Sequence, residues 1–371
     1  MVNKKDKHEF MPVVAVPPGD TIKENMAFLG MNQKELAARL DISEKHLSQI
    51  MNGHAPIMYD TALKLEDVIG PSAEFWMNLE VQYQLTKARL EGEAEMQKDL
   101  EFLKCIPYKE MMKRGWIGFS KEKHRIVESL RKYYGVAHLD LLPLVANAGF
   151  RKHKDRSGID SISVATWLRK AEMEAAGIYV EAFSKRKLKS LISRFRELTM
   201  EKPEIMFPEL QELCASCGVA LVVVEDLPKT YICGATIWKK DKAILALSVR
   251  GKRADSFWFT FFHEIAHLLL HDNKTFHIHH ESKGEKSEEH EKEANRVAGN
   301  YLIPEKLYLK FIDRYEYRNK EAIVDYSNHI GIAPCILLGR LQHDRYLGYQ
   351  MHNELKPSFE IKKIENRLSV V

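Results

Sequence analysis

The sequence predicts a multidomain fold that is mainly α-helical and includes one α+β domain. The 371 residues exceed the usual length of a single domain. Apolar residues at helical spacing dominate residues 20–200, and three β-rich runs follow within residues 219–249. We therefore expect a helical bundle, a helical spacer, an α+β domain with a small sheet, and a C-terminal helical segment. The expected bounds are 1–92, 93–200, 201–312 and 313–371.

Composition indicates a globular protein with reduced cysteines. Hydrophobic residues make up 45% of the chain and charged residues 29%, which excludes disorder as the main theme. No stretch of eighteen apolar residues exists, and prolines break the apolar run near the N-terminus, so we predict neither a membrane span nor a secretory signal. The odd number of scattered cysteines, five, argues against a disulfide framework. We expect a cytoplasmic protein that does not bind membranes.

Charge is distributed unevenly along the chain. Residues 1–90 hold 10 basic and 12 acidic residues, a net charge of −2, whereas residues 121–200 hold 17 and 9, a net charge of +8. The basic runs 151–154 and 185–189 could contact phosphates or an acidic protein. A solvated helix face explains these runs more simply.

The first hundred residues are expected to form five short helices. Apolar residues at helical spacing end at Gly30, and a second helix begins after Asn32, with Glu35 placed as in a capping box. Ser43 opens a third helix that ends at residues 52–53. A fourth spans residues 59–69, and a fifth begins at Ser72.

The second and third helices are joined by a short turn, as in a helix-turn-helix. Such a motif lays its second helix in the DNA major groove. The expected outer face of the third helix is polar, with Ser43, Lys45, His46, Gln49 and Asn52 as candidate contacts. Gln49 and Asn52 suit adenine, and Lys45 suits guanine or phosphate. Any small helical bundle also has a polar face, and the local charge does not favour DNA.

The N-terminal region resembles the HigA-type antitoxin branch of the lambda-repressor-like (XRE) helix-turn-helix family. About sixty residues carry the resemblance, including Asn32-Gln-Lys-Glu-Leu-Ala37, Leu47-Ser-Gln-Ile-Met-Asn-Gly53 and Ala73-Glu-Phe-Trp-Met-Asn-Leu79. It implies a homodimer on operator DNA, with residues 43–52 facing the DNA and Gln33 near a phosphate. It also implies a cognate toxin as a partner.

The region after residue 200 is expected to form a helix followed by a small sheet. Residues 206–217 show helical spacing, and residues 219–224, 232–238 and 243–249 are the β-rich runs. The run 232–238 could be an edge strand that holds a peptide as an added strand. Cys214 and Cys217 have the spacing of a redox or zinc pair, but a packed pair of thiols is the simpler interpretation.

The apolar stretch 257–271 contains His263, Glu264 and His267 in an HExxH arrangement. A step of four residues turns a helix by about 40°, so both imidazoles leave one face and can bind one zinc ion (Zn2+). Glu264 would act on the water at the metal as a catalytic base. Because only three positions are fixed, the pattern alone also arises by chance.

A second helix supplies the expected third ligand. Glu291 and Asn295 lie four residues apart, so Glu291 can complete the metal site while Asn295 supports a ligating histidine. Glu293 is the competing ligand, but it points about 200° away from Glu291. Leu270 and Asn273 exclude the metzincin pattern. The remaining histidines of this region are expected at the helix end or in a polar loop: His271, His277, His279, His280 and His290.

The HExxH segment and the segment with Glu291 and Asn295 together resemble the ImmA/IrrE family of zinc metallopeptidases. The match covers residues 206–304 through His263-Glu-Ile-Ala-His267-Leu-Leu-Leu-His271 and Glu291-Lys-Glu-Ala-Asn295-Arg-Val-Ala-Gly-Asn-Tyr-Leu-Ile-Pro304, and residues 330–342 look like a trailing segment of longer members. Val297 and the charged insert 273–290 depart from the family pattern. The resemblance implies a gluzincin-like fold, zinc bound by His263, His267 and Glu291, and Glu264 as the base.

The two resemblances together predict a DNA-binding transcription regulator or antitoxin with a zinc-dependent endopeptidase domain. Its protein substrate would be the chain itself or a partner repressor. One alternative is a non-proteolytic antitoxin or repressor whose zinc site is structural or inactive. A second is a peptidase whose helix-turn-helix docks proteins instead of DNA.

Overall fold

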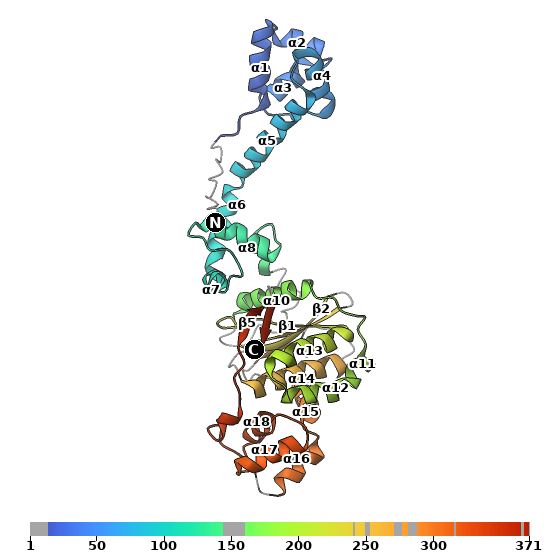
Figure 1. Ribbon diagram of the computed structural model, residues 1–371. Helices are drawn as coiled ribbons and strands as arrows, with labels where there is room; N and C mark the ends of the chain where they lie inside the picture. The colour runs from blue at the N-terminus through green and yellow to red at the C-terminus, as the bar shows by residue number, and fades with distance from the viewer. Residues whose placement is uncertain are drawn as a thin grey trace, which may run out of the picture. The chain divides into compact units, whose positions relative to one another are not determined.

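The computed structural model describes residues 14–143, 160–239, 242–248, 253–270, 277–280, 288–314, 317–364 and 367–370. The chain divides into two compact units, Met1–Glu101 and Phe102–Val371, whose elements are drawn in Figure 1. The mainly helical, multidomain fold with a small sheet confirms the predicted fold class. Within the described residues, no helix combines the length and the apolar character that crossing a bilayer requires.

The first unit is a bundle of helices around one apolar core. Its helices are α1 (Pro18–Leu29), α2 (Gln33–Arg39), α3 (Glu44–Met51), α4 (Tyr59–Ile69), α5 (Ala73–Glu91) and α6 (Glu93–Phe102), the last of which ends in the second unit. The core is built around Ile22, Leu36, Leu47, Leu65 and Trp76, each no more than 1% exposed. The starts of α2, α3, α4 and α5 match the predicted ones because local capping and apolar spacing determine them, whereas α6 is a sixth helix within the segment expected to form the spacer.

Side-chain caps fix the start of the three helices that follow Asn32, Ser43 and Ser72. The side chain of each of these residues accepts a hydrogen bond from the backbone N–H three residues later. The capping box at Asn32 is only half formed, because the Glu35 carboxylate instead pairs with Arg39 at 2.7 Å. Glu80, which is 6% exposed, accepts a hydrogen bond from the backbone N–H of Ile57 and so ties α5 to the start of α4.

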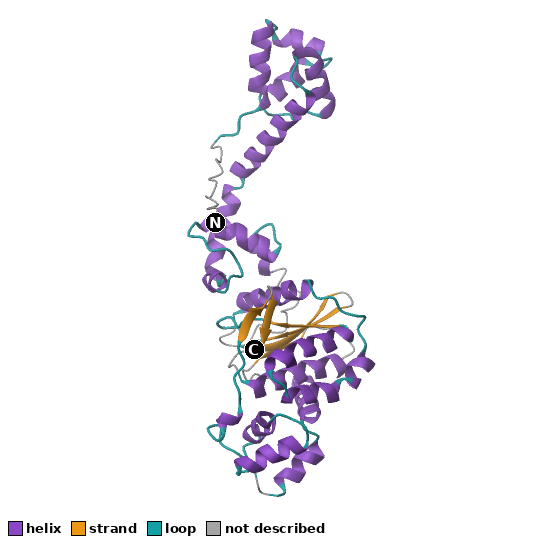
Figure 2. Ribbon diagram, in the orientation of Figure 1, coloured by secondary structure: helices purple, strands orange, loops and turns teal. Residues whose placement is uncertain are grey.

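The second unit consists of a four-stranded sheet with helices packed around it. Its helices are α7 (Tyr108–Lys113), α8 (Lys123–Tyr134), α10 (Ser161–Ala176), α11 (Lys185–Ser190), α12 (Ile192–Glu197), α13 (Pro203–Ser216), α14 (Ala254–Leu270), α15 (Glu288–Leu302), α16 (Glu305–Ile312), α17 (Lys320–His329) and α18 (Pro334–His343), with 3-10 turns at Leu103–Cys105, Leu139–Leu141, Leu198–Met200 and Asn353–Leu355. Figure 2 separates these helices from the strands by colour.

The sheet has the order β1-β3-β2-β4, with β1 (Val219–Val223), β2 (Ile232–Lys239), β3 (Lys242–Leu247) and β4 (His277–His280). β1 pairs with β3 in parallel, whereas β2 pairs with β3 and with β4 in antiparallel fashion. β5 (Ile361–Ile364) and β6 (Arg367–Val370) form a separate antiparallel pair. The hypothesis that residues 232–238 form an edge strand is wrong, because β4, which comes from the charged insert, covers the outer side of β2.

The two faces of the sheet are covered by different helices. Alternate residues of β1, such as Leu221 and Val223, join a core with α13 and α14, while Ala220 and Val222 join a second core with α10. Residues buried on both faces explain why β1 and β3 are continuous apolar runs in the sequence. Helices α10 to α12 lie within residues 93–200, so the expected spacer segment supplies part of both cores.

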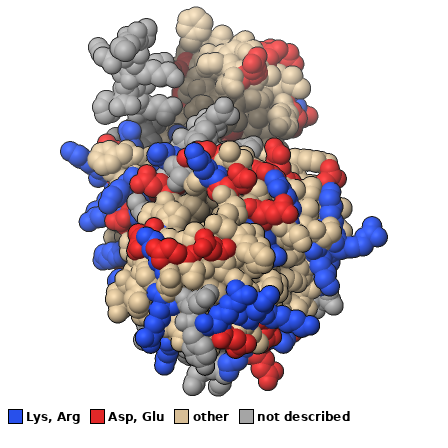
Figure 3. Space-filling view, turned by 60° about the horizontal axis from the view of Figure 1, so that its bottom comes forward, with Lys and Arg blue, Asp and Glu red and all other residues tan. Residues whose placement is uncertain are grey.

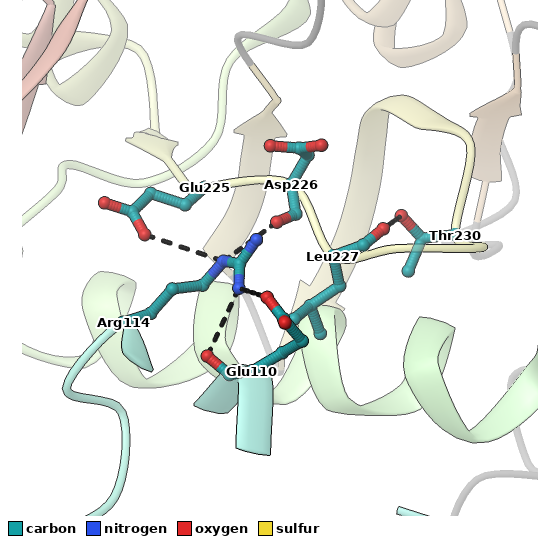
Figure 4. A network of polar contacts seen from close by, with 6 residues as sticks. All are labelled: Glu110, Arg114, Glu225, Asp226, Leu227 and Thr230. Atoms are coloured by element: carbon teal, nitrogen blue, oxygen red, sulfur yellow. Dashed lines mark hydrogen bonds and ion pairs between the residues drawn. The ribbon is translucent and has the colours of Figure 1, made fainter. Parts of the chain in front are cut away.

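Polar contacts attach α7 and α8 to the rest of the second unit. The Arg114 guanidinium donates to the carbonyl oxygen of Asp226 at 3.0 Å and bonds to the Glu110 side chain, which joins α7 to the loop after β1 (Figure 4). The Tyr133 hydroxyl donates to the carbonyl oxygen of Thr166 at 2.9 Å, which joins α8 to α10. α7 is therefore held to the loop that follows β1, and α8 is held to α10.

Candidate functional site

Three of the predicted site residues lie on α14, a largely buried helix. His263 and Glu264 are 0% exposed and His267 is 2% exposed. Large aromatic side chains of the same helix, including Phe261 and Phe262, fill the core around them. Such polar groups are costly to bury unless they bond to partners or hold a cation.

Glu291 of α15 meets the two histidines. Its carboxylate oxygens lie 3.3 Å from Nε2 of His263 and 3.4 Å from Nε2 of His267, and the two Nε2 atoms are 2.9 Å apart. Among the described residues, these three form the one group of at least three potential metal ligands whose donor atoms all lie within 4.8 Å of one another. Glu293, the competing residue, is not part of the group.

Asn295 contacts one of these histidines from α15. Its Oδ1 atom lies 2.9 Å from Nδ1 of His263. An amide oxygen only accepts hydrogen bonds, so Nδ1 carries the proton and donates. The Nε2 atom of His263 is then unprotonated and directed toward Glu291 and His267, the state that a metal ligand requires.

The charge balance at His267 favours a cation. Burial by itself lowers the pKa of His267, but the hydrogen bond to Glu291 and the negative charges of Glu264 and Glu291 outweigh burial and raise the pKa above its usual value. The imidazole therefore holds a proton more strongly than a free histidine does. A metal ion bound at the same atoms would displace that proton.

Two residues of β2 pack against Glu264, and sequence analysis did not find either. The hydroxyl of Thr236, 0% exposed, donates to Oε2 of Glu264 at 2.7 Å. A Cβ atom on Gly234 would lie 2.9 Å from Oε1 of Glu264 and 2.6 Å from Cγ2 of Thr260, so only glycine lets the strand come this close. A glycine inside a β-rich run was the available signal for a close approach.

Among the other histidines near the motif, His290 is the one whose side chain the structure describes, and it is not part of the group. His271 lies outside the described residues, and His277, His279 and His280 fall within β4. His290 is exposed near the start of α15. The expectation of a polar loop for residues 277–280 is therefore wrong, because their backbone pairs with β2.

The helix-turn-helix residues lie on α2, α3 and the turn between them. Ser43 accepts a hydrogen bond from the backbone N–H of His46 at 3.1 Å, and the amide of Gln33 donates to the carbonyl oxygen of Glu44 at 3.2 Å. Asn52 donates to the carbonyl oxygen of Ser48 at 2.8 Å. These side chains therefore also shape the motif itself.

Exposure divides the six candidate DNA contacts into two groups. Ser43, Lys45, Gln49 and Asn52 are exposed, whereas Gln33 and His46 are partly buried. Lys45 and Gln49 are the exposed members whose side chains make no hydrogen bond or ion pair within the described part of the chain. They are therefore the best placed of the six to contact a ligand.

Cys214 and Cys217 are buried free thiols at the end of α13. Burial raises the pKa of Cys217 to about 11 and raises that of Cys214 well above its usual value. A redox or metal-binding pair requires the opposite shift. The packed-thiol interpretation of this motif fits the structure.

Comparisons with known proteins match both halves of the chain. Residues 22–76 match the helix-turn-helix family HTH_3, and residues 219–330 match the peptidase M78 family, described as the IrrE N-terminal-like domain. The uncharacterized HTH-type transcriptional regulator YddM of Escherichia coli (strain K12) is 34% identical over 71 residues, which are 19% of this chain and 76% of that protein. The chain belongs to the helix-turn-helix transcriptional regulators.

Other matches fall on the same N-terminal region. Virulence-associated protein A' of Dichelobacter nodosus is 38% identical over 71 residues, which are 19% of this chain and 62% of that protein. A solved addiction module antidote protein of the HigA family from Coxiella burnetii is 32% identical; the match covers 23% of this chain and 94% of that one, with a TM-score of 0.22. The chain thus joins a helix-turn-helix domain to an IrrE-like domain of a peptidase family, which confirms the predicted fusion.

Proposed function

We propose that this regulator hydrolyses peptide bonds with a zinc ion held by His263, His267 and Glu291. The observation that carries the proposal is that these three side chains, from two helices, come together. Among the described residues, they form the one group whose donor atoms are close enough together to hold a metal ion. The M78 peptidase match over the same residues supports it.

The donor set fits zinc. Two imidazoles and one carboxylate are the ligands of a common class of catalytic zinc sites, which keep a further position for water or substrate. Ligands of one tetrahedral zinc ion, at about 2.0–2.1 Å from it, lie about 3.3 Å from one another. The separations of 2.9 to 3.4 Å between the donor atoms are close to that value. When bound, zinc supplies Lewis-acid chemistry, which activates water near neutral pH and polarises a carbonyl group.

Glu264 is proposed as the general base and acid. It follows His263 directly on α14, and its carboxylate takes a proton from the attacking water and delivers it to the leaving amine. The Thr236 hydroxyl, which donates to Oε2, orients the carboxylate. Asn295 holds the His263 ring in the tautomer that leaves Nε2 available.

The substrate would be a protein segment in extended form. β4 is the outer strand of the described sheet and neighbours β2, which also contacts Glu264. An extended peptide can add to such a strand through its main-chain groups. We propose that the peptide belongs to this chain itself or to a partner repressor, so that cleavage lifts repression.

A cleavage assay with a matched variant tests this function. The zinc-loaded protein is incubated with itself and with proteins encoded next to it, in parallel with Glu264→Gln, which keeps the size of the side chain but not the base. We expect cleavage that is about 100-fold or more slower in the variant. A wild-type protein that binds zinc and cuts none of these proteins would favour the non-proteolytic alternative.

We further propose that the first unit binds operator DNA as a homodimer in the cytoplasm, and that it pairs with a cognate toxin as an antitoxin does. The HTH_3 match and the exposed Lys45 and Gln49 support DNA binding, and the sequence resemblance to HigA-type antitoxins supports the toxin partner. Promoter binding should weaken in Lys45→Ala, with a slope against salt about one unit smaller, and lose sequence preference in Gln49→Ala.

The charge of the first unit favours a second candidate, protein docking. Residues 1–101 hold 11 basic and 17 acidic residues, a net charge of −6, which opposes binding to phosphates. By contrast, basic and acidic side chains are interspersed over the face drawn in Figure 3, which looks mainly onto the second unit. If promoter fragments bind no better than unrelated DNA and with no dependence on Gln49, the docking function is the correct one.

A further inference from the structure

Two arginines from distant parts of the chain bond to the last turn of α15 and to Ile303, the residue that follows it. The final carbonyl groups of a helix have no partner within it and need donors from elsewhere. Arg196 of α12 donates to the carbonyl oxygen of Leu302 at 3.0 Å. Arg340 of α18 donates to the carbonyl oxygens of Gly299 at 3.3 Å and Ile303 at 2.8 Å. Positive charge at this end of a helix also complements its dipole.

Each arginine is itself held in place. The Arg340 guanidinium lies 3.9 Å from the centre of the Tyr308 ring, a side chain of α16 that is 4% exposed. Arg196 also donates to the carbonyl oxygen of Ile330, at the end of α17, at 3.2 Å. The two side chains therefore link the end of α15 to α12, α16, α17 and α18.

The other end of α15 carries the groups of the metal centre. Ala294 and Ala298, both 0% exposed, lie on the helix next to Glu291, which is partly buried, and Asn295, which is exposed. Alanine side chains set how close two helices come, but they make no directional bond. The arginine contacts to the last turn are directional, so they limit rotation and sliding of α15.

The length of the helix makes a small tilt important. From Glu291 to Leu302 the helix rises about 16 Å, so a tilt of about 5° about its end moves the Glu291 carboxylate by about 1.4 Å. Metal–ligand distances tolerate only about 0.2 Å. A loosened last turn would therefore disturb the ligand geometry.

We propose that Arg196 and Arg340 are positioning residues for the metal centre. By holding the last turn of α15, they set the place of the Glu291 carboxylate and the Asn295 amide relative to the histidines of α14. This inference rests on the proposed zinc site. Both arginines lie outside the matched segment 219–330, so elements before and after the IrrE-like region complete the centre.

Zinc affinity of arginine variants tests the proposal in the full-length protein. Arg340→Met removes the donors but keeps an unbranched stem over Tyr308, and Arg196→Met removes the second contact. Arg340→Lys keeps the charge and a donor. The control is Arg194→Met on the same helix as Arg196, because Arg194 is exposed and pairs with Glu197 and Glu209 instead of α15.

Zinc affinity is measured by competition with a chelator. We expect it to be about 10-fold lower than in the wild type in Arg340→Met and Arg196→Met. The affinity of Arg340→Lys should lie between these values, and that of Arg194→Met should equal the wild-type value. The visible spectrum of the cobalt-substituted protein should change in the same order, because it reports ligand geometry. If Arg340→Met does not fold, Arg196→Met and Arg340→Lys decide the question.

Two negative outcomes are distinguishable. A wild-type protein that binds no zinc would overturn the zinc site itself, and with it the proposed function. Wild-type affinity and cobalt spectra in the methionine variants, even with a lowered melting temperature, would show that the arginines only stabilise the fold and would overturn this inference alone.

Discussion

Oδ1 of Asn295 lies 2.9 Å from Nδ1 of His263, and this contact joins α15 to α14 one turn beyond Glu291. The amide cannot bind zinc through this contact, but it decides which histidine nitrogen carries the proton. One residue thus links the orientation of one proposed ligand, His263, to the placement of the helix that provides another, Glu291. The relationship leads to a direct test.

Replacing Asn295 with alanine should lower zinc affinity by about 10- to 100-fold, because the His263 ring loses the acceptor that fixes its tautomer and orientation. Competition with a chelator at constant pH measures the affinity. Asn300→Ala on the same helix is the matched control. Equal zinc affinity in the wild type and Asn295→Ala would show that the contact does not support the ligand.

Thr236→Val should slow hydrolysis while leaving the zinc content unchanged. Valine keeps the volume of threonine but cannot donate to Glu264, and a hydrogen bond of about 1.4 kcal/mol that orients the base corresponds to a rate change of about 10-fold. The kcat/KM for a cleaved substrate and the bound zinc are measured together. Thr166→Val, which removes a buried hydroxyl that contacts Tyr134, controls for lost stability. Zinc loss in Thr236→Val would instead assign Thr236 a role in the metal site.

Gly234→Ala should damage both stability and activity. The added methyl group would press on Thr260 and on Glu264, both on α14. Overpacking of this kind costs about 1–3 kcal/mol and would displace the proposed base. The matched change Gly299→Ala meets no atom within 4 Å and lies inside α15, so it should stabilise the protein by about 0.5–1 kcal/mol. Thermal unfolding compares the two, and equal melting temperatures would argue against the close approach of β2.

Local patterns predicted most of the elements that carry the candidate sites. The caps at Asn32 and Ser43 and the helix at residues 59–69 follow from residues that are neighbours in sequence, and the structure has them at those positions. The pairing of Glu291 with Asn295 was read from a spacing of four residues on one helix. Such signals survive folding because one turn of helix places the side chains together.

Contacts between distant segments were not predictable in the same way. The position of Thr236 beside Glu264 depends on how β2 crosses α14, and the contacts of Arg196 and Arg340 depend on three separate helices. The same limitation explains the error at β2. The strand that covers it lies within a charged insert whose composition indicates a loop, and pairing with an existing strand overrides that preference.

Thiol labelling should separate the exposed cysteine from the buried ones. Burial raises the pKa of Cys217 to about 11 and of Cys335 to about 12, so at pH 8 only about one thousandth or less of either is thiolate, the reactive form. Cys105 is exposed and should react with iodoacetamide first. Labelling of Cys217 should increase as the pH rises toward 11, since deprotonation increases with pH. Mass spectrometry of peptides from native and denatured protein measures this. Labelling of Cys214 or Cys217 as fast as that of Cys105 in the native protein at pH 8 would contradict the packed-thiol interpretation and restore a redox or metal role for the pair.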